Sequence, residues 1–368
     1  MRRSLLLIAL ATGIGAASAA RRSSEAALPS ALPGPGAPAP AVRQSASLPN
    51  LHHVQLNTLD AEAAVAWYLD LWPAAERARV AGMPAVVAEM MLLFREVDEA
   101  PPGGFNAELG RSDPQSAFWH IGAFSNTTFL EDRLGDLGVL RLPLFTSPED
   151  DDGVWRSGLA PYVGMRTVAD MTPDVEALPR PGGFGYVLGP DGALIEFTGG
   201  PRTHDSFSHV HFFHEQPLCA ANWYAQHLGV ELPPIRGDDG QESPRPSWDP
   251  CETATGEATW PSLERQGTVR QPRGGVSYGN GSMAWYPNQC TAERCGEAQP
   301  FAASRGQVLD HVAFTVDDLD ALYEDLASAG VTILEAPHSF DKTRAFMIQD
   351  PDGLAVELVE SSGAPPLG

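Results

Sequence analysis

The chain of 368 residues is long enough for two domains that each bury a core of their own. Apolar residues make up 43% of it and aromatic residues 8%, which is typical of a folded protein and excludes a disordered one. The formal net charge of -23 disfavours nucleic acids and anionic membrane surfaces as partners. Composition does not indicate an oligomeric state, which the sequence leaves open.

The first 48 residues are expected to lie outside the folded body. Residues 1–20 combine a basic start at Arg2 and Arg3, an apolar stretch and small residues, which predicts a secretory signal peptide. Residues 21–48 are rich in proline and alanine and are interpreted as a linker. We therefore expect an exported protein, periplasmic or extracellular, without an inserted membrane span.

Four later segments share one beginning, a histidine followed by a branched apolar residue that opens an apolar run. They start at His53, His120, His209 and His311. In each, the apolar run is followed by a helical pattern and then by short apolar runs between turn residues. The chain therefore predicts four repeats of one strand, one helix and about three strands. In the first and third, the pairs Trp67–Tyr68 and Trp223–Tyr224 have the same spacing from the histidine and are expected to pack helix against sheet.

Capping and turn residues mark where these elements begin and end. Asp60, Asn126 and Asp317 are predicted N-caps, and Gly138 and Gly330 are expected to end two helices. Two hairpins are expected to turn at the sequences GPDG (189–192) and DPDG (350–353).

Two long polar segments rich in proline and glycine, 143–181 and 232–306, are interpreted as surface loops inserted into the second and third repeats. The second holds Cys251, Cys290 and Cys295, whereas Cys219 falls in a predicted helix. Because export would place these thiols in an oxidising compartment, we expect a disulfide among the three clustered cysteines. The pairing itself stays open.

The second and fourth repeats each end in a strand that carries a glutamate, Glu196 and Glu357. Histidine, histidine and glutamate, recurring once in each half of the chain, are the ligand types of a mononuclear metal site. Two imidazoles and one carboxylate leave half of an octahedral ion open for a bidentate oxygen substrate and a third molecule such as dioxygen. A carboxylate within an apolar strand also needs a partner.

Further histidines near the strand openings compete for the ligand role. On an extended strand His52 faces opposite to His53, so one of the two is expected to point away from the metal. His211 shares a face with His209 and is either the ligand or its neighbour, and His214 lies on the same segment. Position along the strand favours His209.

With its His-Val or His-Ile strand openings and its two terminal PDGxxxE hairpins, the chain resembles the vicinal oxygen chelate superfamily from Leu48 to Glu360. That superfamily includes glyoxalase I, bleomycin-resistance proteins and extradiol dioxygenases. The resemblance implies an α+β fold in which four βαβββ units form two tandem, open, cup-shaped modules of mixed β-sheet. We expect these modules at residues 49–202 and 203–368, the second with the insertion 232–306. Carried over by position, the ligand sets are His53, His120 and Glu196 in the first module, and His209, His311 and Glu357 in the second.

Within the superfamily, the C-terminal module resembles extradiol dioxygenases most. His338 precedes the hairpin that bears Glu357, as does a histidine of that family that assists proton transfer, so the resemblance implies an acid/base role for it. The family's tyrosine ten residues before the glutamate is Met347 here, whereas the N-terminal module has Tyr186 at that spacing and lacks the histidine.

The resemblance also offers other functions. Glyoxalase I uses a second glutamate, for which Glu89 and Glu96 are the candidates in the first repeat, and the bleomycin-resistance type binds a small ligand without a metal. We expect an exported, metal-dependent, extradiol-type dioxygenase that acts on a small molecule with vicinal oxygens. The divalent metal is expected to be Fe2+ or Mn2+, with Zn2+ or Ni2+ as alternatives. A glyoxalase-like lyase or isomerase and a non-catalytic binding protein are the alternative functions.

Overall fold

The computed structural model describes twelve stretches of the chain: 48–106, 111–125, 134–139, 141–142, 183–199, 206–214, 217–233, 235–236, 242–243, 274–279, 281–287 and 300–361. The predicted signal peptide, almost all of the linker, the N-cap Asn126 and the insertion 143–181 lie outside the described residues, as do Cys251, Cys290 and Cys295.

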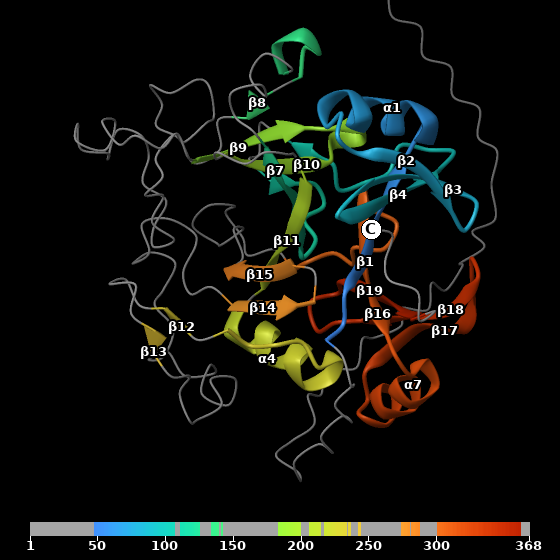
Figure 1. Ribbon diagram of the computed structural model, residues 1–368. Helices are drawn as coiled ribbons and strands as arrows, with labels where there is room; N and C mark the ends of the chain where they lie inside the picture. Colours follow the sequence, from blue (N-terminus) through green and yellow to red (C-terminus); the bar gives the residue numbers. More distant parts are fainter. Residues whose placement is uncertain are drawn as a thin grey trace, which may run out of the picture. The chain divides into compact units, whose positions relative to one another are not determined.

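Most described strands belong to two open sheets that mix parallel and antiparallel pairs (Figure 1). The eight-stranded sheet has the order β17 (Thr332–Phe340), β18 (Thr343–Gln349), β19 (Ala355–Glu360), β16 (Leu309–Val316), β1 (Leu51–Thr58), β4 (Met90–Glu96), β3 (Met83–Ala88) and β2 (Glu76–Val80). The seven-stranded sheet has the order β14 (Gly274–Tyr278), β15 (Gly281–Pro287), β11 (Ser206–His214), β7 (Phe118–Ser125), β10 (Leu194–Gly199), β9 (Gly183–Leu188) and β8 (Arg141–Leu142).

Two short hairpins complete the strands: β5 (Phe105–Asn106) with β6 (Arg111–Ser112), and β12 (Ile235–Arg236) with β13 (Glu242–Ser243). The α+β fold with two open mixed sheets agrees with the sequence prediction.

The way the repeats combine differs from the prediction. At the centre of the larger sheet β1 pairs antiparallel with β16, so the first repeat joins the fourth. At the centre of the smaller sheet β7 pairs antiparallel with β11, so the second repeat joins the third. Each sheet therefore draws strands from both predicted modules, and the boundary between residues 202 and 203 does not separate the two sheets. Since all four opening strands are similar apolar runs, their patterns do not specify which two become neighbours.

Three described helices pack against the sheets: α1 (Ala61–Leu71), α4 (Pro217–Leu228) and α7 (Leu319–Ser328) (Figure 1). The Asp60 side chain accepts a hydrogen bond from the Ala63 amide at 2.9 Å, which confirms it as the N-cap of α1. The N-cap of α7 is Asp318, which accepts from the Ala321 amide at 3.0 Å, so the prediction of Asp317 was wrong by one residue. Gly330 follows α7 with a φ of 79°, the left-handed conformation expected after a helix.

One continuous apolar core contains residues of both sheets and of all three helices. Tyr68 on α1 and Tyr224 on α4 are fully buried in it, as the repeated Trp-Tyr pair predicts. The Tyr224 hydroxyl donates to Asp350 at 3.0 Å, at the turn between β18 and β19. A helix that packs on the smaller sheet is thereby hydrogen-bonded to a hairpin of the larger sheet.

The predicted insertion 232–306 is only partly a loop, because β14 and β15 lie within it and β15 pairs with β11. Cys219 on α4 is disulfide-bonded, which the expectation of a bond among the other three cysteines did not include. None of the helices in the described stretches is long and apolar enough to cross a membrane.

Candidate metal centres

The six predicted ligands form two clusters, but not by chain half. His53, His311 and Glu357 lie together on the larger sheet and are called the outer site, because the first and last repeats supply them. His120, Glu196, His209 and His211 lie together on the smaller sheet and are called the inner site. Relative to the predicted triads, His53 and His209 have changed places. This follows from the strand pairing, which brings β1 to β16 and β7 to β11.

The outer site is a buried convergence of two imidazoles and one carboxylate. The Nε2 atom of His53 lies 3.4 Å from Oε2 of Glu357, and Nε2 of His311 lies 3.9 Å from the same oxygen. The three residues are 0%, 3% and 4% exposed. These three atoms make no hydrogen bond with any described residue. Buried polar atoms are normally satisfied, so three that converge without a hydrogen bond fit a shared cation.

The other nitrogen of each outer histidine is held by a neighbour. Nδ1 of His53 lies 2.8 Å from Nδ1 of His52, and Nδ1 of His311 lies 2.6 Å from a carboxylate oxygen of Asp310. Asp310 in turn accepts hydrogen bonds from the Gly306 amide and the Asn57 side chain. In metal sites such partners fix the ring orientation of the histidines, and here they would leave Nε2 directed at a bound ion.

His338 on β17 stands at the more open side of the outer site. Its Nε2 lies 3.9 Å from Oε1 of Glu357 and 3.8 Å from Oε2 of Glu335, and its side chain is 35% exposed. Glu335 also pairs with Arg305, whose side chain is 39% exposed. Glu357 is therefore approached by buried histidines on one side and by a solvent-accessible histidine on the other.

The charges at the outer site suit ligation through the neutral imidazole of His53. Burial, with the nearby rings of His52 and His311, lowers the pKa of His53 well below its usual value, so its ring is neutral. Burial raises the pKa of Glu357, while the charges of His311 and His338 oppose that rise. A cation among these groups would favour the carboxylate form.

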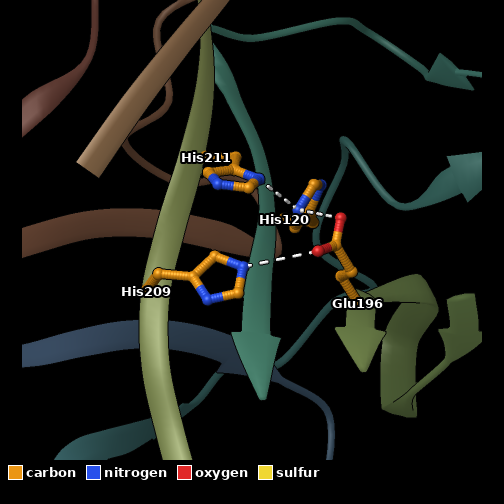
Figure 2. Close-up of side chains that lie close together, drawn as sticks. All are labelled: His120, Glu196, His209 and His211. Carbon is orange, nitrogen blue, oxygen red and sulfur yellow. Dashed lines mark hydrogen bonds and ion pairs between the residues drawn. The ribbon is translucent and has the colours of Figure 1, made fainter. Parts of the chain in front are cut away.

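The inner site gathers one more imidazole than the outer site (Figure 2). Nε2 of His120 lies 3.2 Å from Oε2 of Glu196, and Nε2 of His209 lies 3.5 Å from Oε1. Nδ1 of His211 lies 2.9 Å from Nε2 of His120. The rings of His209 and His211 extend from β11 toward His120 on β7 and Glu196 on β10, and all four residues are buried.

Aromatic side chains surround the inner site. The Tyr186 hydroxyl donates to Oε2 of Glu196 at 2.8 Å, as its position opposite that residue on β9 allows. The rings of Trp119 and His120 lie edge to face with their centroids 4.4 Å apart. The ring centroids of Tyr286 and His211 are 5.1 Å apart. The tyrosine that the dioxygenase resemblance lacked near Glu357 is thus in the other site, where it holds the carboxylate.

Glu196 is the charged partner in this apolar setting. Burial alone would raise its pKa, but the hydrogen bond and charge of His120, with contributions from His209 and His211, hold the pKa well below its usual value. The carboxylate is therefore the form present, and a carboxylate is what a metal requires.

The sequence did not single out Asp310, and it expected His52 to point away from His53. A register irregularity between Leu51 and His53 breaks the strict alternation of β1, which lets the His52 ring reach His53. Neither alternative glutamate of the glyoxalase hypothesis joins a described cluster. Glu96 ends β4 and contacts the Ala61 amide at 3.4 Å, and Glu89 is exposed at a left-handed turn position with a φ of 66°.

Comparisons with known proteins agree with the fold. Residues 206–358 match the model of the Glyoxalase/Bleomycin resistance protein/Dioxygenase superfamily. Glyoxalase I from Zea mays is similar with a TM-score of 0.52 at 13% identity, covering 85% of this chain and 92% of that one. A putative dioxygenase from Bacillus subtilis has a TM-score of 0.48 at 12% identity and covers 87% and 86%. At its low identity, the likeness to glyoxalase I concerns the fold alone. No curated protein matched.

The match begins at β11 and ends within β19, so it contains two of the four histidine-led strands and one of the two glutamate-bearing ones. The repeats outside it have the same strand order and supply the remaining ligands. Residues 206–358 are therefore assigned to the glyoxalase/bleomycin resistance protein/dioxygenase superfamily.

Proposed function

We propose that this protein is a metal-dependent, extradiol-type dioxygenase whose reaction takes place at the outer site. The observation that carries the proposal is the convergence of Nε2 of His53, Nε2 of His311 and Oε2 of Glu357, which are buried and make no hydrogen bond with the described residues. Two imidazoles and a carboxylate are the donor set of iron oxygenases that keep positions open for substrate and dioxygen.

When bound, the metal would hold the two vicinal oxygens of the substrate and bring dioxygen beside them. We favour Fe2+ or Mn2+ because the reaction needs a redox-capable ion, with Zn2+ or Ni2+ as the choice for a lyase. His53, His311 and Glu357 would hold the ion. His52 and Asp310 would keep the two imidazoles in place through Nδ1.

His338 is the residue proposed to move a proton. It lies beside Glu357 without being one of the three converging ligands, and it is partly exposed, so a substrate hydroxyl bound at the metal could reach Nε2. Its Nδ1 lies 3.1 Å from the Ala336 carbonyl oxygen, which orients the ring. In the overall reaction one ring carbon–carbon bond breaks and both atoms of dioxygen enter the product, so no further reductant is needed.

The test is oxygen uptake by full-length protein that has been purified anaerobically and loaded with Fe2+ or Mn2+. Catechol and a carboxylated catechol serve as probes, and the ring-opened product is followed by its visible absorption. We expect the wild-type protein to consume oxygen. His311→Gln should abolish both this oxygen uptake and metal binding at the outer site. The matched variant His227→Gln removes a buried histidine on α4 that lies outside both sites. It should keep the oxygen uptake and the outer metal.

Failure would take one of two forms. If no transition metal binds at the outer site, the cup is a binding site for a small ligand and the enzyme hypothesis is lost. If metal binds but neither catechol consumes oxygen, isomerase assays with a hemithioacetal distinguish the glyoxalase-like alternative. For localisation we propose export, which cell fractionation of a full-length, tagged protein would test against retention in the cytoplasm.

A further inference from the structure

We infer that the inner site is a second metal centre with four protein ligands, His120, His209, His211 and Glu196, of the kind that holds zinc. Each of the four offers one ligand atom, and these atoms lie within 4.8 Å of one another. They come from three adjacent strands: β11 supplies two, and β7 and β10 supply one each. This inference does not depend on the proposed function, which concerns the outer site.

A glycine makes the room for this arrangement. Gly122 on β7 lies opposite His209 on one side and opposite Glu196 on the other. A Cβ atom at this position would come within 1.9 Å of Nε2 of His209. The imidazole therefore lies directly over the backbone of residue 122. The equivalent residue between His53 and Glu357 in the outer site is Ala313.

The fourth member of the inner site is the additional histidine, His211. His211 follows His209 by two residues and pairs with His120 across the sheet, so the two side chains share a face. Its Nδ1 reaches Nε2 of His120 at 2.9 Å, the same nitrogen that faces Glu196. In the outer site the residue two positions after His53 is Gln55, so the outer site has no imidazole at the position of His211.

The donor set and its burial decide the class of metal. Four protein ligands close the coordination of zinc in structural sites, whereas catalytic sites keep a position open. Three imidazole nitrogens and one carboxylate are donors that zinc accepts, and nitrogen-rich sites favour it over iron and manganese. The four residues are between 0% and 8% exposed and are lined by Trp119, Tyr186 and Tyr286. The inner site would hold its ion without presenting it to a substrate.

The test is a Co2+ titration of metal-free, full-length protein, because four-coordinate cobalt absorbs visible light far more strongly than six-coordinate cobalt. We expect two ions per chain, one of them with the intense spectrum. His211→Gln, which copies Gln55 of the outer site, should abolish that spectrum and weaken binding of its ion at least about tenfold. His311→Gln should remove the other ion only, and His227→Gln should change neither.

Two results would overturn the inference. One is a single bound ion that His311→Gln removes. The other is an unchanged spectrum and affinity in His211→Gln, which would make His211 a hydrogen-bond partner of His120 and no ligand. Should the His211 variant fail to fold, X-ray absorption of Zn2+ in the His311→Gln protein decides the matter: three imidazole ligands support the inference, and two contradict it.

Discussion

The outer and inner sites are built at the same positions of the same repeat and differ in what surrounds the ligands. Each has a histidine from two opening strands and a glutamate from a closing strand. The outer site adds His52, Asp310 and the partly exposed His338, which leave Nε2 atoms converging on Glu357. The inner site adds a third imidazole and a tyrosine on the carboxylate. One duplicated scaffold can thus provide one open and one closed donor set.

The largest expected effect separates the two glutamates. Glu357→Gln should lower oxygen uptake by about a thousandfold or more, roughly 4 kcal/mol, because it removes the only carboxylate in the outer cluster. Glu196→Gln should instead release the inner ion while the outer ion stays. Turnover and metal content of the two variants, measured side by side, check this. Equal losses in both proteins would contradict a division of roles.

Acid should destabilise the metal-free protein through His52. This histidine belongs to the outer site alone, because the equivalent residue of the inner site, which precedes His209, is Ser208. Burial lowers the pKa of His52 from 6.5 to about 4, despite an opposing contribution from Asp341. The neutral ring is favoured on folding, so its stabilisation is present above pH 6.5 and is lost as the pH falls through about 4. The loss is about 3 kcal/mol at most.

This pH dependence is measured as the free energy of unfolding between pH 7 and pH 4. His52→Gln should make the curve less steep, while the buried His53 and His214, whose pKa values are also lowered, keep part of the acid sensitivity. A curve with the same slope in both proteins would show that other groups account for the acid sensitivity.

His338→Gln should lower kcat by about a hundredfold and leave the metal in place, as expected for a residue that moves a proton without ligating. The kcat profile against pH should lose one of its limbs. Loss of the outer metal in this variant would instead make His338 a ligand.

Substitutions of the two equivalent small residues, Gly122 in the inner site and Ala313 in the outer site, should have different effects. Gly122→Ala should weaken binding of the inner ion about tenfold, about 1.4 kcal/mol, because the new Cβ displaces the His209 ring. Ala313→Gly gives the outer site the glycine that the inner site has at the equivalent position. It should lower the free energy of unfolding by only about 0.5–1 kcal/mol. Cobalt titration and thermal unfolding of both proteins test the pair.

The smallest effect is expected at the residue opposite each glutamate, Tyr186 in the inner site and Met347 in the outer site. Tyr186→Phe removes one hydrogen bond to Glu196 and should weaken binding of the inner ion by about 1 kcal/mol. Met347→Tyr would place the same phenol beside Glu357. Calorimetric titration of both variants with Zn2+ shows whether the phenol strengthens or blocks binding.

Local features were largely predictable from the sequence because they depend on neighbouring residues. The histidine-led strands, the N-cap Asp60, the left-handed Gly330 and the buried tyrosines follow from periodicity and capping chemistry. The prediction failed where one residue shifts the geometry. A register irregularity redirected His52, and a choice between two adjacent aspartates moved the cap of α7.

The sequence alone indicated the histidines and glutamates of the two clusters and the strands that carry them, because the same His and Glu positions repeat with the fold. Tertiary structure decided which ligands share a site. His53 meets His311 and Glu357, rather than His120 and Glu196, because β1 pairs with β16 and β7 pairs with β11. Four similar apolar strands carry no local signal for that choice, which depends on how all four repeats pack around one core.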